Sequence, residues 1–183
     1  MTNIFEAIVA ESQSRPATCG SVRVIAVDGP AGAGKTTLAH FLSTQLGNCP
    51  VISMDSLYNG WDDAITEATI HRVIEQILQP LERDMPTSYQ TYDWHAEQFA
   101  GRCEIEPATF VILEGVGSSH PMLRPYLTLT IWVEAQEKLL LKRVLKRDGE
   151  QIREQMLKWQ KMERNYFRAT NAKEFADFVI NAQ

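Results

Sequence analysis

Apolar residues are grouped along this chain in two different ways. In the first, five short runs are almost continuously apolar, which is typical of strands buried on both faces of a sheet. The first run ends at Asp28 and Gly29, residues that commonly follow a strand. The runs cover residues 22–27, 51–53, 110–113, 127–133 and 178–180.

Between these runs, apolar residues recur every three or four positions, which predicts helices with one buried side. Thr66 is placed to cap one of these helices, and Gly47 is placed to end another. The expected helices cover residues 3–12, 34–46, 66–81, 134–148 and 152–167, with a break at Asp148 and Gly149.

Strands that alternate with helices predict an α/β fold with a parallel sheet. The segment 86–107 lacks a clear helical period, so we expect a β excursion there with a loop at Ala100 and Gly101. We find no repeat and no linker that would divide the chain. One domain is therefore expected over residues 1–183, with a helix and connector in 1–20 and the core in 21–183.

The composition excludes several classes of protein. Hydrophobic residues make up 44% and charged residues 22%, which is ordinary for a globular chain. The net charge is −5 without basic blocks, so no nucleic-acid partner is expected. We also expect no membrane partner, because no apolar run is long enough to span a bilayer. The N-terminus lacks secretory features and the three cysteines show no CxxC pair, which indicates a reduced, cytoplasmic protein.

The strongest motif follows the first apolar run. Residues 29–36 read Gly-Pro-Ala-Gly-Ala-Gly-Lys-Thr, which fits the phosphate-binding pattern G-x-x-x-x-G-K-[ST] between a strand and a helix. Lys35 is expected to reach the β- and γ-phosphates, and the Thr36 hydroxyl is expected to bind Mg²⁺. The motif predicts ATP and Mg²⁺ as cofactors, although GTP stays open as the donor. The expected nucleotide contacts are Gly29, Ala31, Gly32, Ala33, Gly34, Lys35, Thr36 and Thr37.

Three acidic residues follow predicted strands, at the sheet edge where ligands bind in parallel α/β folds. Glu114 is expected to hold Mg²⁺ directly or through water, with a helix cap or a solvated loop acid as the alternative. Asp55 is expected to accept the proton of an attacking hydroxyl or to orient that hydroxyl, with an Asx turn or a helix N-cap as the alternative. Asp28 ranks third, because it is also placed to tie down the phosphate loop.

Four pieces in order carry a family resemblance: the phosphate loop, Ser-Met-Asp-Ser-Leu-Tyr at 53–58, Tyr-Asp-Trp at 92–94 and Leu-Glu-Gly-Val at 113–116. From about residue 22 to residue 180, the chain resembles the uridine kinase and phosphoribulokinase group of P-loop kinases. The resemblance implies a three-layer P-loop NTPase fold with a five-stranded parallel sheet, helices on both faces and a helical lid. It places an acceptor region at about 55–107 and the lid at about 143–167.

The resemblance also implies roles for single residues. Asp55 looks like the family's catalytic base and Glu114 like its metal-associated acid. Tyr58 matches a tyrosine near the acceptor site, while Tyr92 and Asp93 match a segment that lines the nucleoside pocket. The lid arginines that contact phosphates in the family have Arg143, Arg147 and Arg153 as counterparts, with a solvated basic helix face as the alternative.

From their chemistry alone, the flat rings of Trp61, Tyr92 and Trp94 are suited to stack on an acceptor, with packing beneath a loop as the alternative. The sequence predicts a kinase of a small hydroxyl-bearing metabolite, with a nucleoside as the first choice. A nucleoside monophosphate acceptor stays open, because residues 25–36 are also similar to the opening of cytidylate kinases. A nucleotide switch that hydrolyses slowly is a third hypothesis, and a homo-oligomer stays open.

Overall fold

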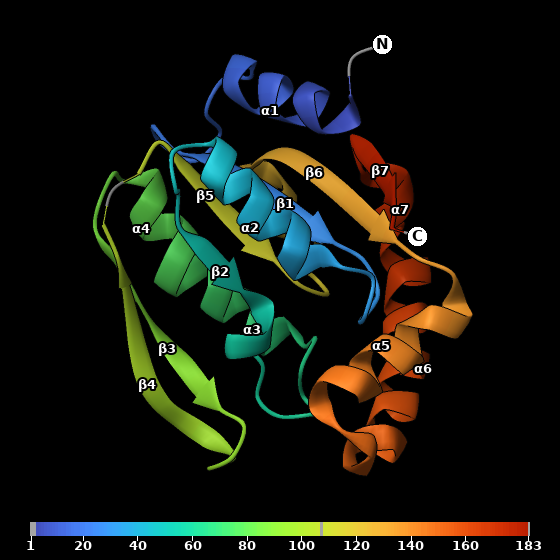
Figure 1. The fold of residues 1–183 in the computed structure, drawn as a ribbon. Helices are drawn as coiled ribbons and strands as arrows, with labels where there is room; N and C mark the ends of the chain where they lie inside the picture. Colours follow the sequence, from blue (N-terminus) through green and yellow to red (C-terminus); the bar gives the residue numbers. More distant parts are fainter. Residues whose placement is uncertain (1–2, 107, 183) are drawn as a thin grey trace.

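Five parallel strands form the central sheet, in the order β2-β5-β1-β6-β7 (Figure 1). The computed structural model describes residues 3–106 and 108–182, so positions 1, 2, 107 and 183 of the expected domain lie outside the described residues. The predicted five-stranded parallel sheet is confirmed. Its strands are β1 (Arg23–Asp28), β2 (Val51–Ser53), β5 (Phe110–Glu114), β6 (Leu127–Glu134) and β7 (Phe178–Asn181).

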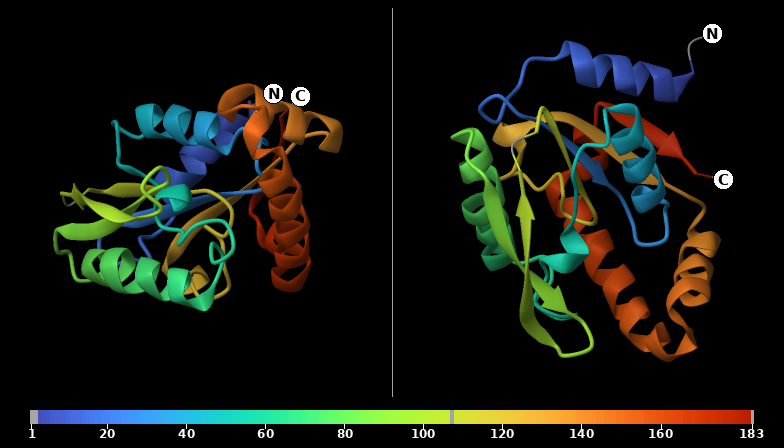
Figure 2. Two further views of the ribbon diagram at one scale, coloured as in Figure 1. Left: turned by 90° about the horizontal axis from the view of Figure 1, so that it is seen from below. Right: turned by 60° about the vertical axis from the view of Figure 1, so that its left-hand side comes forward.

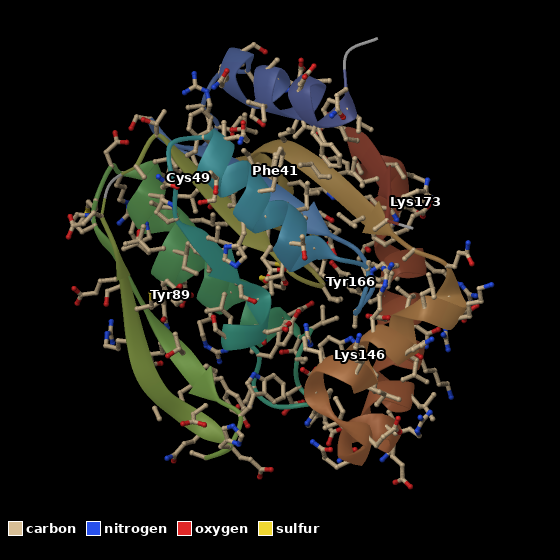
Figure 3. All side chains as sticks on the ribbon, in the orientation of Figure 1. Phe41, Cys49, Tyr89, Lys146, Tyr166 and Lys173 are labelled. Carbon is tan, nitrogen blue, oxygen red and sulfur yellow. The ribbon has the colours of Figure 1, made fainter. Side chains whose placement is uncertain are left out.

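Helices cover both faces of this sheet (Figures 1 and 2), and side chains fill the space between them (Figure 3). Ile25 and Val27 of β1 pack toward α1 (Ile4–Ser14) and α2 (Lys35–Gln45). Val24 and Ala26, on the opposite face of the same strand, belong to a second cluster. That cluster includes side chains from α3 (Glu67–Val73), α4 (Gln79–Glu82) and α6 (Arg153–Thr170). The alternation of β1 side chains thus produces the expected three layers.

The chain between α3 and β5 supplies a separate pair of strands. A π-helical turn at Ile74–Leu78 joins α3 to α4. Strands β3 (Thr87–Asp93) and β4 (Gln98–Ile105) then pair antiparallel, as a β excursion predicts. The predicted loop at Ala100 and Gly101 is wrong, because both residues lie within β4. The turn is at residues 94–97, where the Asp93 side chain accepts hydrogen bonds from the next backbone N–H groups and Glu97 adopts a left-handed φ of 52°.

Two helices pack beside the carboxyl ends of the strands, in the part of the chain where a lid is expected (Figure 1). Their action as a lid stays a prediction. Helix α5 (Glu137–Asp148) ends at Gly149, so the predicted break is confirmed. A 3-10 turn at Glu150–Ile152 leads into α6, and the short α7 (Ala172–Phe175) precedes β7. None of the helices within residues 3–106 and 108–182 is long and apolar enough to cross a membrane.

Candidate active site

A cavity of about 990 Å³ lies at the carboxyl ends of the central strands. The loop after β1 contributes Ala31, Gly32 and Gly34, the first turn of α2 contributes residues 35–37, and the turn after β2 contributes Asp55. Glu114, the last residue of β5, lines the same cavity. Parallel strands therefore bring the phosphate loop and two of the predicted carboxylates together, although these segments are far apart in the sequence.

The phosphate loop is held in a tight turn by glycines. Gly32 has a φ of 81°, and a side chain at this position would collide with the backbone of Leu140 in α5. Gly34, with a φ of 104°, directly precedes α2. The Lys35 ammonium group donates to the Pro30 carbonyl oxygen across the loop over 3.0 Å. The free N–H groups at the start of α2 and the Lys35 charge make this loop a suitable anion site.

Thr36 and Glu114 lie together beneath this loop. The Thr36 hydroxyl donates to a Glu114 carboxylate oxygen over 3.3 Å. Burial raises the pKa of the Glu114 carboxyl, and the nearby Asp55 charge acts in the same direction. Across the described ranges, no three His, Cys, Asp or Glu side chains gather to hold a metal by themselves. Mg²⁺ commonly takes one or two protein oxygens together with phosphate and water oxygens, so this pair fits it.

Asp55 lies in a 3-10 turn directly after β2. Its side chain reaches the solvent of the cavity, but the protein surrounding it raises the pKa of the carboxyl. The charges of Lys35 and Arg147 lower this pKa in turn. A carboxylate with a raised pKa is a stronger base, which suits acceptance of a proton from a hydroxyl. The catalytic role of Asp55 stays a prediction.

Asp28 ties down the loops around the site, as one of its two predicted roles requires. Its buried carboxylate accepts hydrogen bonds from the backbone N–H groups of Gly29, Gly117 and Ser119 and from the Ser119 hydroxyl, at 2.7 to 3.1 Å. Gly29 lies against the backbone of Val133 and does not line the cavity. Asp28 and Gly29 therefore stabilise the conformation of the phosphate loop from the protein interior.

Three tryptophans line the cavity and form a tryptophan wall. Trp61 and Trp94 were considered as stacking residues from the sequence, and both line the cavity. Their rings meet edge to face at 5.2 Å between centroids. The indole N–H of Trp94 donates to the Asp55 carbonyl oxygen over 2.9 Å, so this wall is attached to the segment that carries the candidate base. Trp159 of α6 completes it, with its ring 6.0 Å from that of Trp61.

The other residues expected at the acceptor are placed differently. Tyr58 lines the cavity, but its hydroxyl donates to the Val116 carbonyl oxygen over 2.6 Å. Tyr92 packs edge to face on Trp94 and does not line the cavity. Asp93 uses its carboxylate to form the hairpin turn. The structure thus places Tyr92 against Trp94 and Asp93 at the hairpin turn, and neither lines the cavity.

Two of the predicted lid arginines reach the cavity. Arg143 approaches the Gly32 carbonyl oxygen at 3.4 Å, and Arg147 pairs with Asp148 at 2.7 Å beside the cavity. The predicted counterpart Arg153 pairs instead with Glu150 on the exposed surface, and the structure does not bring it to the phosphate loop. The lysines of α5 are exposed and point away from the lining.

The sequence analysis assigned no chemical role to Glu163 of α6. This carboxylate is 2% exposed and accepts a hydrogen bond from the backbone N–H of Ala31, in the phosphate loop, over 3.0 Å. Burial raises the pKa of its carboxyl to about 7. A signal was present, because an acidic residue stood at a core position of an otherwise apolar helical stripe.

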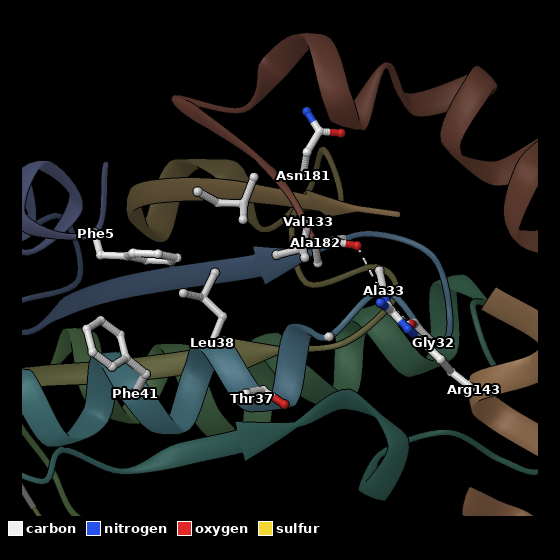
Figure 4. Close-up of a pocket in the computed structure, with 12 residues that line it drawn as sticks. Phe5, Gly32, Ala33, Thr37, Leu38, Phe41, Val133, Arg143, Asn181 and Ala182 are labelled. Carbon is white, nitrogen blue, oxygen red and sulfur yellow. Dashed lines mark hydrogen bonds between the residues drawn. The ribbon is translucent and has the colours of Figure 1, made fainter. Parts of the chain in front are cut away.

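A second, largely apolar cavity of about 540 Å³ lies beside the phosphate loop (Figure 4). Phe5 of α1 and Phe41 of α2 form one end of it, with ring centroids 5.5 Å apart. Arg143 reaches the Ala182 carbonyl oxygen at the other end, at 3.5 Å. Thr37 lines both cavities, so the two spaces meet at the phosphate loop. The N-terminal helix, whose role the sequence left open, thereby contributes to this region.

Comparisons with known proteins extend this picture. No protein-family profile matches the chain. It is 29% identical over 164 residues to the inorganic pyrophosphatase TTM2 of Arabidopsis thaliana and 25% identical over 164 residues to the uridine-cytidine kinase C of Dictyostelium discoideum. These matches cover 82% and 83% of the chain but only 24% and 36% of the relatives. The chain therefore spans about a third or less of the curated proteins it resembles.

Two solved structures match almost the whole chain. A possible uridine kinase from Bacillus stearothermophilus superposes with a TM-score of 0.70 and 17% identity, covering 96% of each chain. A putative fructose transport system kinase from Silicibacter sp. TM1040 superposes with a TM-score of 0.67 and 18% identity, covering 98% of each chain. The chain therefore has the fold of P-loop kinases, and the resemblance seen in its sequence is confirmed at this level.

Proposed function

We propose that this protein is a phosphotransferase that uses Mg²⁺ and ATP to phosphorylate a hydroxyl group of a small, uncharged metabolite, with nucleosides as the first class to test. One observation carries the proposal: a single cavity is lined by the phosphate loop, by the Thr36–Glu114 pair, by Asp55 and by the tryptophan wall. Donor, metal and acceptor would thus meet in one space, as in-line transfer requires.

The bound Mg²⁺–nucleotide complex would supply a phosphoryl group whose charge is partly neutralised. Lys35 and the start of α2 would bind the phosphates, and Thr36 and Glu114 would provide oxygens for the metal. Asp55 would orient the acceptor hydroxyl and take its proton. Arg143 and Arg147 border the cavity on the α5 side, where they would stabilise phosphate charge and help exclude water.

The charges around the tryptophan wall favour an uncharged acceptor. A monophosphate would need arginines there, and the arginines of the acceptor region are Arg72, Arg83 and Arg102. Arg72 donates to the Leu57 carbonyl oxygen over 2.7 Å and stacks on Phe99. None of these three arginines lines the cavity. The flat indole faces suit a nucleoside base, and the relatives named as uridine or uridine-cytidine kinases support that class.

The test is acceptor-dependent ADP formation with Mg²⁺–ATP across nucleosides, sugars and nucleoside monophosphates. We expect one acceptor class to stimulate ADP release and Asp55→Asn to reduce that release by about 100-fold or more. Glu75→Gln, which removes a charge from an exposed position outside the cavity, is the matched control and should be active. Stimulation by monophosphates alone would contradict the uncharged acceptor. Nucleotide binding without stimulation by any acceptor would favour the switch hypothesis.

One further arm follows from the relative named as an inorganic pyrophosphatase. Inorganic pyrophosphate is offered with Mg²⁺ in the absence of nucleotide. The proposal expects no release of phosphate, because Asp55 is placed to activate an acceptor hydroxyl against the tryptophan wall. Rapid hydrolysis of pyrophosphate, together with no acceptor-stimulated ADP formation, would replace the kinase proposal.

A further inference from the structure

Glu163 is a buried acid that the proposed chemistry does not use. It lies in the middle of the 18-residue helix α6, on the same side as the buried residues Met156 and Trp159. A carboxylate in such surroundings is costly unless hydrogen bonds and nearby positive charge compensate it. An apolar side chain at this position would avoid the cost of burying a carboxylate. The contacts of Glu163 therefore explain why an acid is found there.

One carboxylate oxygen of Glu163 joins two parts of the site. Oε2 accepts the backbone N–H of Ala31 over 3.0 Å and the indole N–H of Trp159 over 2.9 Å. Ala31 belongs to the phosphate loop and lies 132 positions from Glu163 in the sequence. Trp159 belongs to the wall that faces the acceptor space. A single atom thus links the donor side of the cavity to its acceptor side.

The link continues along the wall. The Trp159 ring packs 5.3 Å from Tyr58 and 6.0 Å from Trp61, and Trp61 packs on Trp94. Trp94 in turn donates to the carbonyl oxygen of Asp55. Packed rings of this kind move together, because close packing transmits small displacements to neighbours. A displacement of Glu163 would therefore also displace the rings of the tryptophan wall.

Nucleotide binding should disturb Glu163 for an electrostatic reason. The phosphate loop is an anion site, so a bound polyphosphate places negative charge beside a buried carboxylate. The Lys35 charge, which attracts Glu163 in the free protein, is then shared with the phosphates. The Ala31 N–H, which now donates to Glu163, belongs to the phosphate loop and could donate to a bound phosphate instead. All three effects weaken the hold of Glu163 on the loop.

We propose that Glu163 is a positioning residue that transmits occupation of the phosphate loop to Trp159 and so couples nucleotide binding to the shape of the acceptor wall. The inference rests on the proposed function in one respect, since it requires that the loop binds a nucleotide. It requires neither a known acceptor nor turnover. The function of the bridge is to make the acceptor space respond to the donor, which would limit transfer to water when the acceptor is absent.

Tryptophan emission tests the coupling directly. The chain has four tryptophans, of which Trp132 lies outside the wall, with its indole N–H on Glu134 and its ring 4.6 Å from Phe167. A non-hydrolysable ATP analogue with Mg²⁺ is titrated at about pH 8, where the Glu163 carboxyl, with its pKa of about 7, is mostly ionised, while emission and, separately, binding heat are recorded. We expect saturable binding together with a change in emission. Trp132→Phe should keep this change, and Trp159→Phe should lose most of it.

Glu163→Gln isolates the charge, because glutamine keeps an oxygen acceptor and a similar shape. We expect this variant to stay folded and to bind the analogue within about tenfold of the wild type, with less than half of the emission change. Glu154→Gln, at an exposed position of the same helix, is the matched control and should respond like the wild type. If Glu163→Gln fails to fold, Trp159→Phe carries the test, because it keeps most of the aromatic packing and removes the N–H donor.

The outcomes separate this inference from the proposed function. Absence of analogue binding to the wild type would overturn both. Binding with a full emission change in Glu163→Gln, or with the change retained in Trp159→Phe, would overturn the coupling and leave the kinase proposal standing. Binding to the wild type without any change in emission would also overturn the coupling and leave the kinase proposal standing.

Discussion

The pH dependence of stability offers a test of the buried Glu163 that needs no ligand. Burial raises the pKa of this carboxyl from its ordinary 4.5 to about 7, since the hydrogen bonds from Ala31 and Trp159 only partly compensate for lost water. Between these two pH values the folded protein holds a proton that the unfolded chain releases. The free energy of unfolding therefore falls as pH rises through this window.

The magnitude follows from the two pKa values. Their difference, taken from about 7 and 4.5, corresponds to about 3 kcal/mol at roughly 1.4 kcal/mol for each pKa unit. Glu163→Gln removes the ionisation but keeps an oxygen for the two donors. We expect this variant to gain stability over the wild type as pH increases, reaching about 3 kcal/mol by pH 8. For a chain of 183 residues this is a difference in Tm of about 6–12 °C.

The assay is urea unfolding of both proteins at several values between about pH 4.5 and 8, without nucleotide. Subtracting the wild type from the variant cancels the carboxyls of Asp28, Asp55 and Glu114, whose pKa values burial also raises. Glu154→Gln, which alters an exposed carboxyl of the same helix, should show a small difference that does not change with pH. A stability difference for Glu163→Gln that is flat across this range would refute the reasoning.

Three further predictions concern the loop and its supports. Gly32→Ala should weaken nucleotide binding by about tenfold or more in calorimetry, because a side chain at its φ of 81° meets the backbone of Leu140; unchanged affinity would mean that the loop does not bind the phosphates in this shape. Thr36→Val keeps the shape of the side chain and removes its hydroxyl. The factor by which Mg²⁺ increases the affinity for the ATP analogue, measured with Mg²⁺ and with EDTA, should therefore fall by about tenfold. An unchanged factor would place the metal elsewhere. Asp28→Ala leaves the donors of Gly29, Gly117 and Ser119 without their acceptor and should cost about 3 kcal/mol or more in urea unfolding; a loss below about 1 kcal/mol would contradict its structural role.

Most of the fold was predictable because its signals are local. Each central strand appears as a run of apolar, often β-branched residues, and each run is short enough to be read without knowing its partners. The break between α5 and α6 was visible at Gly149, which adopts a φ of 96° that other residues avoid. The hairpin turn was misplaced because Gly101 is a turn signal only by composition, whereas Asp93 forms the turn through its side-chain hydrogen bonds.

The candidate site was predictable only in part. The phosphate loop, Asp55 and Glu114 were found because they follow strands whose ends meet in space. The positions of Tyr92 and Asp93 could not be inferred in the same way, since the face of a hairpin strand that meets the cavity depends on its register. The register set by the 94–97 turn leaves Trp94 in the lining and Tyr92 behind it.

The sequence by itself determined the order of strands and helices, the phosphate-binding loop and the acids that follow the strands, because each depends on residues that are neighbours in the chain. Only the tertiary structure decided which side chains surround that loop. The tryptophan wall joins segments from three parts of the sequence. Glu163 reaches Ala31 across 132 positions because α6 packs back across the ends of the strands, and the burial that raises its pKa arises from the same packing.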